Sequence, residues 1–319
     1  MGVSFLTPNG ALLALAALVP LLALLASERR AAAVRRLLAL RGPRRRALAP
    51  VVVALVLLPA LVAVAAAQPV IVRDRQLTQR ADAQVFFVLD TSLSMEARTG
   101  PHGPTRLARA KAEALRVWQT LGDIPAGIAS MTDRTLLHLL PTTDPALFER
   151  TLAQSIGIDR PPPSQLYSNR ATTFQALLAI GPSNFFPPRV RHRIIVVFTD
   201  GEAAPGSVRL TIRPEDVIPL LLVHVWSPTE HIYVRGGKVD PRYSPDPTSA
   251  GLLEAFAKLT GGRAFSEHDL GAVIAAIRAE AGKPTAHQTV TAASRIPLAP
   301  WFVLGGVVPL GFLLYRRNL

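Results

Sequence analysis

The chain has 319 residues, of which 49% are hydrophobic, and it carries a formal net charge of +13. This length suffices for one or two domains with a full hydrophobic core. The chain contains no cysteine, which excludes disulfide bonds, a thiol nucleophile and a cysteine-based zinc site. Any folded domain must therefore be held together by its own core.

Three apolar segments have lengths close to the roughly 20 residues that a helix needs to cross a bilayer. They are residues 5–26, 49–67 and 297–315. A cleavable signal peptide would need a basic region before its apolar part, but the first 26 residues contain no Lys or Arg. We therefore predict three transmembrane helices rather than a signal peptide followed by core helices.

Basic residues mark the ends of these segments. Residues 27–48 hold eight arginines and one glutamate, and Arg316 and Arg317 follow the third segment. Because loops rich in Lys and Arg stay in the cytoplasm, we expect residues 27–48 and the tail 316–319 to be cytoplasmic. The sequence thus predicts a multi-pass protein of the inner (cytoplasmic) membrane with an extracytoplasmic domain. The positive charge suits anionic lipid headgroups, and we expect no nucleic-acid partner.

The extracytoplasmic region alternates strand patterns with helix patterns. We expect polar stalks at residues 68–83 and 283–296, and a domain at residues 84–282 between them. Apolar runs typical of strands occupy residues 84–89, 126–132, 135–140, 193–199, 217–226 and 263–265. Helical patterns occupy residues 105–122, 145–156, 173–180, 249–260 and 270–281. This alternation predicts an α/β domain with a doubly wound, mostly parallel sheet.

A carboxylate and two hydroxyls follow the first of these strands. Asp90, Ser92 and Ser94 come directly after the apolar run 84–89. Ligand sites of open α/β sheets form at the carboxyl ends of the strands, and hard oxygen ligands at alternating positions suit a small divalent cation. Taken alone, the same residues are also typical of a helix N-cap.

Two further segments bring oxygen side chains to the same edge of the predicted sheet. Asp200 follows the most apolar strand, and Gly201 after it permits a tight turn. Thr172 lies in a loop that leads into a predicted helix. Thr173 is the alternative, but we prefer Thr172 because Phe174 then takes the apolar position that precedes the helix.

These three segments resemble, in order and spacing, the metal-binding loops of von Willebrand factor type A (VWA) domains. The family usually has Gly where this chain has Ala171. The resemblance implies a divalent-metal (MIDAS-type) site for Mg²⁺, or alternatively for Mn²⁺ or Ca²⁺. The metal ligands that it implies are Asp90, Ser92, Ser94, Thr172 and Asp200.

A narrower resemblance rests on the start of the next helix. Residues 104–111 read P-x-R-L-x-x-A-K, and the chain has two amino-terminal spans joined by a basic loop and one carboxyl-terminal span. These features are similar to the aerotolerance (Bat-type) membrane VWA proteins of bacteria. The resemblance implies a non-enzymatic protein of the cell envelope that binds a protein ligand, with an acidic residue of the ligand reaching the metal. It also implies other VWA membrane proteins and a MoxR-type AAA+ ATPase as partners.

Two other functions fit the same residues. One is a metal-free structural subunit of a membrane complex. The other is a Mg-dependent hydrolase, although the chain has no G-x-S-x-G, no P-loop and no histidine in a recognised nucleophile or zinc spacing. Residues 226–247 and 159–171 are long loops at the expected metal edge, with Tyr167, Tyr233 and Tyr243 as candidates for ligand contact. The alternative is that these loops are simply solvated.

Overall fold

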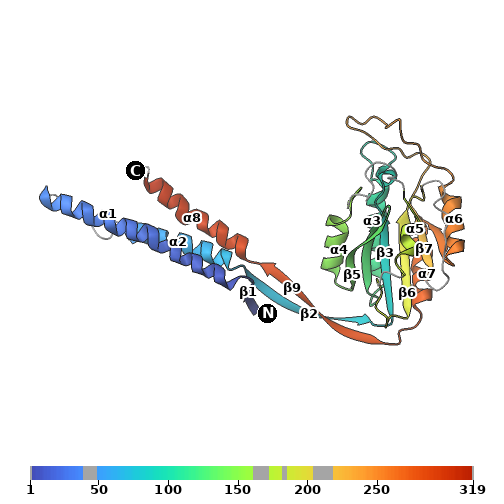
Figure 1. The fold of residues 1–319 in the computed structure, drawn as a ribbon, viewed down its shortest axis with the longest axis horizontal. Helices are drawn as coiled ribbons and strands as arrows, with labels where there is room; N and C mark the ends of the chain where they lie inside the picture. Colours follow the sequence, from blue (N-terminus) through green and yellow to red (C-terminus); the bar gives the residue numbers. More distant parts are fainter. Residues whose placement is uncertain (1, 39–48, 161–171, 182–184, 204–217, 318–319) are drawn as a thin grey trace. The chain divides into compact units, whose positions relative to one another are not determined.

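The computed structural model describes residues 2–38, 49–160, 172–181, 185–203 and 218–317 (Figure 1). Contacts divide the chain into two compact units, Met1–Gln76 with Thr291–Leu319, and Leu77–Val290. The first unit holds the long apolar helices, and the second holds an α/β domain.

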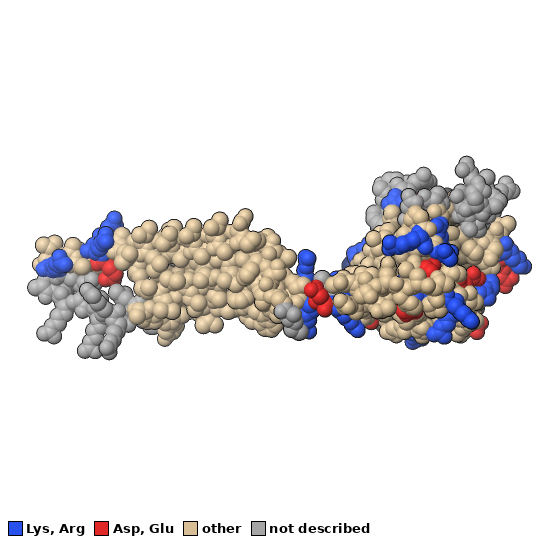
Figure 2. Space-filling view, turned by 90° about the horizontal axis from the view of Figure 1, so that it is seen from below, with Lys and Arg blue, Asp and Glu red and all other residues tan. Residues whose placement is uncertain are grey.

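Apolar helices make up most of the first unit. A 3₁₀ helix, η1 (Pro8–Ala17), continues into α1 (Leu18–Leu37), and the other two helices are α2 (Ala49–Ala66) and α8 (Ala299–Arg317). Three stretches, Pro8–Val34, Ala49–Ala66 and Ala299–Arg316, are long and apolar enough to cross a membrane. In Figure 2 the visible face of this unit shows no charged side chain along the body of the helices, and charged side chains gather near its ends. The predicted apolar spans are thus matched by helices.

The segment predicted as a cytoplasmic loop, residues 27–48, is partly helical. Helix α1 runs on to Leu37, past the predicted end of the first span at residue 26. Alanine and arginine are strong helix formers, and the chain has no Gly or Pro between Val34 and Gly42 that would end the helix earlier. Residues 39–48 lie outside the described part of the chain.

The two predicted stalks contain strands. Strands β2 (Pro69–Arg80) and β9 (His287–Pro297) belong to a three-stranded sheet with β1 (Gly2–Phe5), in the order β1-β2-β9. The polar composition of these segments predicted stalks without a secondary structure, and β-branched residues such as Val70, Ile71 and Val72 favour a strand there. The pairing joins segments far apart in the sequence, so a local pattern could not predict it.

The second unit is built on a six-stranded sheet in the order β5-β4-β3-β6-β7-β8. Every neighbouring pair is parallel except β4 and β5, which form an antiparallel hairpin. The strands are β3 (Ala83–Asp90), β4 (Ala126–Met131), β5 (Thr135–Thr142), β6 (His192–Thr199), β7 (Leu220–His224) and β8 (Arg263–Ser266). The predicted α/β fold with a mostly parallel sheet is therefore confirmed.

Helices cover both faces of this sheet (Figure 1). Along β3, Phe87 packs in a core with α3 (Arg106–Thr120), α4 (Pro145–Gln154) and α7 (Leu270–Ala281). The alternate residue Phe86 packs in a second core with α5 (Gln175–Leu178) and α6 (Ser249–Leu259). Successive side chains of a strand point to opposite faces, so the apolar run 85–89 of β3 supplies side chains to both cores. Helix α5 is one turn, shorter than the predicted 173–180, because Gly181-Pro182 follows it closely.

The sheet register sets the positions of the predicted site residues. Strands β3 and β6 are parallel neighbours, and Leu89 pairs with Phe198. The next residues along the two strands, Asp90 and Thr199, therefore leave the sheet side by side at its carboxyl edge. The loop between β7 and α6, which contains residues 226–247, extends from the same edge (Figure 1).

Candidate metal site

Asp90 is the centre of the candidate site. Its side chain is completely buried at the end of β3, where Oδ1 accepts a hydrogen bond from the Ser92 backbone N–H at 2.9 Å. Oδ2 accepts from the hydroxyls of Thr172 at 3.0 Å and Thr199 at 2.6 Å. Burial raises the pKa of Asp90, although these donors act against that shift. The carboxylate is therefore held in one orientation by groups from three segments.

The two serines of the first loop lie beside Asp90. Ser92 Oγ is 3.0 Å from Ser94 Oγ. Ser92 stands at the N-cap position of a short 3₁₀ turn, Leu93–Glu96, but its side chain makes no capping hydrogen bond. The helix-cap interpretation of these serines therefore does not describe the structure, and their hydroxyls instead lie among the oxygens of the candidate site.

Asp200 approaches the same region from the end of β6. It is completely buried; its Oδ1 accepts from the Glu202 backbone N–H at 3.0 Å, and its Oδ2 accepts from Arg106 Nη1 at 3.0 Å. Gly201 has φ of +73°, the left-handed conformation that glycine adopts without strain. A Cβ there would lie 2.9 Å from the Leu253 side chain. The turn predicted after Asp200 thus depends on glycine at this position.

The two buried carboxylates, Asp90 and Asp200, interact electrostatically. Burial raises the pKa of Asp200, and the charges of Asp90 and Glu202 raise it further, whereas Arg106 and a hydrogen bond from Ser94 lower it. The arginine is shared among several carboxylates, so it does not neutralise both aspartates. A small divalent cation would offset the repulsion, and the hydroxyl and carboxylate oxygens are the ligands that Mg²⁺, Mn²⁺ or Ca²⁺ prefers. The donor set therefore fits such an ion.

Thr172 rather than Thr173 turns its side chain to this site. The Thr172 hydroxyl lies 3.0 Å from Asp90 Oδ2, and the residue is completely buried. Thr173 is held through its backbone N–H, which donates to the carbonyl of Thr132 at 2.9 Å. Ala171, the departure from the family pattern, lies outside the described residues, as does most of the 159–171 loop with Tyr167.

Several residues that contact the site were not predicted as part of it. Thr199 and Arg106 touch the two aspartates directly, and Glu202 contacts Arg106 at 2.9 Å. Arg106 belongs to the P-x-R-L-x-x-A-K motif, and Glu202 follows Asp200 by two positions. The sequence motif thus contains Arg106, but only the fold shows that this side chain contacts Asp200.

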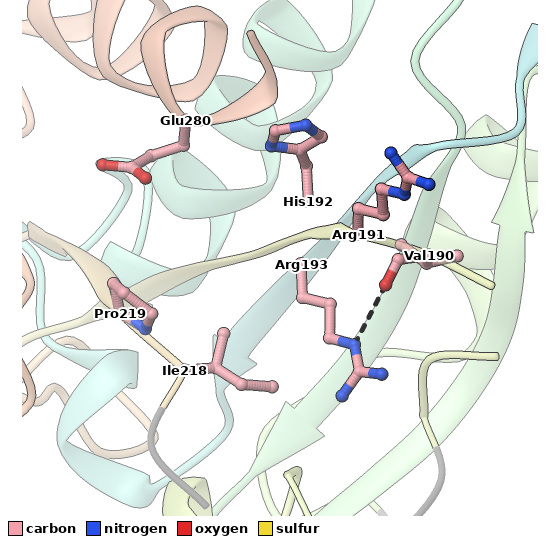
Figure 3. Close-up of a pocket in the computed structure, with 7 residues that line it drawn as sticks. All are labelled: Val190, Arg191, His192, Arg193, Ile218, Pro219 and Glu280. Carbon is pink, nitrogen blue, oxygen red and sulfur yellow. Dashed lines mark hydrogen bonds between the residues drawn. The ribbon is translucent and has the colours of Figure 1, made fainter. Parts of the chain in front are cut away.

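A cavity at the opposite edge of the sheet is not a second candidate. It has a volume of about 390 Å³ and is lined by Val190, Arg191, His192, Arg193, Ile218, Pro219 and Glu280 (Figure 3). Arg193 Nε donates to the carbonyl of Val190 at 3.3 Å, and Arg191 and Arg193 extend in different directions. Its cationic groups therefore do not converge on one point. Among the residues that the structure describes, no group of three or more His, Cys, Asp or Glu is placed to hold a metal ion; the candidate site has two carboxylates, and its other proposed ligands are hydroxyls.

A known protein family matches part of this chain. The model of the von Willebrand factor type A domain matches residues 85–202, a range that contains Asp90, Ser92, Ser94, Thr172 and Asp200. No protein of curated function matches the sequence.

Three solved structures match this chain at low sequence identity. The conserved hypothetical protein BatB from Bacteroides thetaiotaomicron is 22% identical with a TM-score of 0.50, over 62% of this chain and 98% of that one. An aerotolerance-related membrane protein from Bacteroides fragilis is 21% identical with a TM-score of 0.47, over 62% and 98%. A proximal thread matrix protein from the mussel byssus, whose MIDAS motif holds zinc, is 11% identical with a TM-score of 0.37, over 75% and 52%.

Proposed function

We propose that this chain, which carries a von Willebrand factor type A domain like that of the Bat-type membrane proteins, binds a protein partner through a divalent cation. The observation that supports this function is the convergence of three loops on two buried carboxylates. Asp90 and Asp200 bring the negative charge, and neutral hydroxyls surround them. The residues proposed to hold the cation are Asp90, Ser92, Ser94, Thr172 and Asp200.

The charge of the ligand set suits binding of an acidic partner. Two carboxylates contribute about −2, which balances a divalent cation without excess, and the hydroxyls of Ser92, Ser94 and Thr172 add no charge. Bound Mg²⁺ keeps water ligands that a carboxylate of a partner can replace. The role of this chain is then to orient the oxygens: Thr199 fixes Asp90, and Arg106 fixes Asp200.

We further propose that the apolar helices anchor this domain in the inner membrane, with the domain on the extracytoplasmic side. The three apolar stretches and the arginines after the first of them support this topology. Other VWA membrane proteins and a MoxR-type AAA+ ATPase remain proposed partners that rest on the family resemblance. The ATPase would meet the cytoplasmic segment 27–48, which is the largest basic segment of the chain.

A metal-free structural role is the second candidate, and one contact favours it. Arg106 already places a cation 3.0 Å from Asp200, so the site is partly neutralised without metal. A Mg-dependent hydrolase has less support, because the one histidine that contacts a site residue, His224, faces the backbone carbonyl of Asp200 at 3.0 Å rather than a space for substrate.

Calorimetric titration of the full chain in detergent with Mn²⁺ and Mg²⁺ tests the proposal. The wild type is expected to bind one ion, and Asp90→Asn is expected to abolish binding. The matched control is Asp123→Asn, which changes an aspartate paired with His287 at 2.8 Å and should bind as the wild type does. If the wild type takes up no ion, the metal-free structural role replaces the proposed one.

A further inference from the structure

We propose that Arg106 positions the metal site and couples it to the 226–247 loop, so that metal occupancy and the order of this loop depend on each other. This inference rests on the proposed function, because it assigns a control element to the same site. Arg106 lies outside the proposed ligand set, and the 226–247 loop is the surface that would respond to the ion.

Arg106 is a completely buried cation at the start of α3. Its Nη1 lies 3.0 Å from Asp200 Oδ2 and 2.9 Å from Glu202 Oε1, and its Nε lies 2.7 Å from Glu230 Oε2. A buried guanidinium is tolerated only when its charge and its N–H groups are matched by partners. Of the three guanidinium nitrogens of Arg106, Nη2 alone has no hydrogen-bond partner among the described residues. The side chain is thus fixed by three carboxylates, one of which belongs to the proposed metal site.

The contacts on the other side of Arg106 belong to the 226–247 loop. Glu230 is buried, and it accepts from Arg106 and from the Ser227 backbone N–H at 3.1 Å. Arg109 forms a second ion pair with Glu230 at 2.6 Å. The hydroxyl of Tyr243 accepts from Arg106 Nη1 at 2.9 Å. Both halves of the loop are therefore tied to α3.

Glu202 connects the 226–247 loop to the proposed metal-binding loop that contains Asp200. Besides Arg106, it accepts hydrogen bonds from Trp226 Nε1 at 2.9 Å, from the Tyr243 hydroxyl at 2.9 Å and from the Asp246 backbone N–H at 3.2 Å. Three of its four donors thus come from the 226–247 loop. The loop also pairs with the segment after the first metal loop, through the backbones of Arg98 and His231 at 2.9 and 3.0 Å.

The Asp200 carboxylate joins the proposed metal site to the contacts of Arg106. Asp200 Oδ2 is the partner of Arg106 and belongs to a proposed metal ligand. An ion that draws on Asp200 changes the balance of the Arg106 contacts, and these contacts extend to Glu230 and Tyr243. Linkage is reciprocal for binding free energies, so a change confined to the loop must alter metal affinity if metal alters the loop. A partner seated on the loop would then strengthen metal binding.

The test uses two Tyr→Phe variants of the full chain in detergent. Tyr243→Phe removes the hydroxyl that joins Arg106 to Glu202 and leaves the ion pairs in place. Tyr233→Phe makes the same chemical change in the same loop, where the hydroxyl has no hydrogen bond to a described residue. Titration with Mn²⁺ is expected to show an affinity about fivefold lower for Tyr243→Phe than for the wild type, at the small end of typical couplings. Tyr233→Phe is expected to bind Mn²⁺ with wild-type affinity.

The reverse direction is measured by hydrogen–deuterium exchange of the loop. The backbone N–H groups of Val234 and Asp240 donate within the loop at 2.8 Å each, so their exchange reports its opening. Mn²⁺ is expected to slow this exchange in the wild type, and Arg106→Lys, which keeps the charge but loses the branched contacts, is expected to remove the effect.

The outcomes separate this inference from the proposed function. If the wild type binds no Mn²⁺, both fail. If it binds Mn²⁺ but loop exchange does not change, or if Tyr243→Phe binds as tightly as Tyr233→Phe, the coupling is overturned and the metal site stands. If the far-UV circular dichroism spectrum of Arg106→Lys is that of an unfolded protein, the comparison of Tyr243→Phe with Tyr233→Phe decides.

Discussion

Arg106 and Asp200 form a completely buried ion pair, with Nη1 and Oδ2 3.0 Å apart. The pair joins the start of α3 to the end of β6, at the edge of the sheet where Asp90 also lies. Arg106 thus holds Asp200 in one orientation, which is the arrangement that the proposed metal site would need.

Removal of the Arg106 charge is expected to destabilise the domain strongly. Arg106→Gln leaves Asp200 and Glu202 without their cation and Glu230 with Arg109 alone, and removal of one partner of a buried ion pair costs about 3–5 kcal/mol. Urea denaturation followed by tryptophan fluorescence measures the change. As a control, Arg263→Gln alters an exposed pair 3.9 Å from Glu280 and should cost less than about 1 kcal/mol. Equal losses for the two variants would contradict the central role of Arg106.

The two adjacent threonines of the second loop provide a matched pair of substitutions. Thr172→Val removes the hydroxyl that lies 3.0 Å from Asp90 Oδ2, and we expect it to lower Mn²⁺ affinity by about tenfold, the effect of one lost hydrogen bond to a charged group. Thr173→Val removes a hydroxyl from a residue that is anchored through its backbone, and its affinity should stay at the wild-type value. A larger loss for Thr173→Val would reverse the assignment of the second loop.

Glycine at position 201 is expected to be required for its space as well as its conformation. Gly201→Ala adds strain at φ of +73° and a contact 2.9 Å from Leu253, so we expect a loss of about 2–4 kcal/mol. Gly236→Ala has φ of +90° but no atom within 4 Å of the added Cβ, and strain alone costs about 1–2 kcal/mol. Thermal unfolding of the two variants measures the difference, and similar midpoints would show that the Leu253 contact is relieved without cost.

The buried carboxyl group of Glu113 is expected to make the stability of the protein depend on pH. Burial, reinforced by the nearby charge of Glu267, raises the pKa of Glu113 to about 8. Because the folded protein then holds this proton more tightly than the unfolded chain, the stabilisation is complete below the ordinary Glu pKa of about 4.3 and falls as pH rises toward 8, by at most about 1.4 kcal/mol per pH unit. Glu113→Gln should match the wild type near pH 4.5 and be more stable at pH 8, whereas the exposed Glu254→Gln should match it at both. A wild type whose stability does not differ from that of Glu113→Gln at pH 8 would refute this expectation.

The features that the sequence predicted correctly depend on local pattern. Strands β3 and β6 are continuous apolar runs because both faces of each are buried, and such runs are visible in a single sequence. Asp90 and Asp200 stand at the ends of these runs, so a parallel sheet was enough to bring them to one edge.

The features that the sequence did not reveal depend on contacts between distant residues. Arg106 and Glu230 are 124 positions apart, and nothing in either segment identifies the other as its partner. The same holds for Tyr243, which was predicted only as one of several tyrosines on a long loop. The segments of β2 and β9 were interpreted as stalks from their polar composition, and their strands were not predicted because the pairing is also non-local.

The position of a bound ion distinguishes the proposed metal site from the alternatives. Crystals of the protein grown with Mn²⁺ are expected to show one anomalous-difference peak at the carboxyl edge of the sheet, within about 2–3 Å of the Ser92, Ser94 and Thr172 hydroxyl oxygens, the range of metal–oxygen bonds. A peak at another place in the domain, or none at this edge with Mn²⁺ in excess, would contradict the metal site.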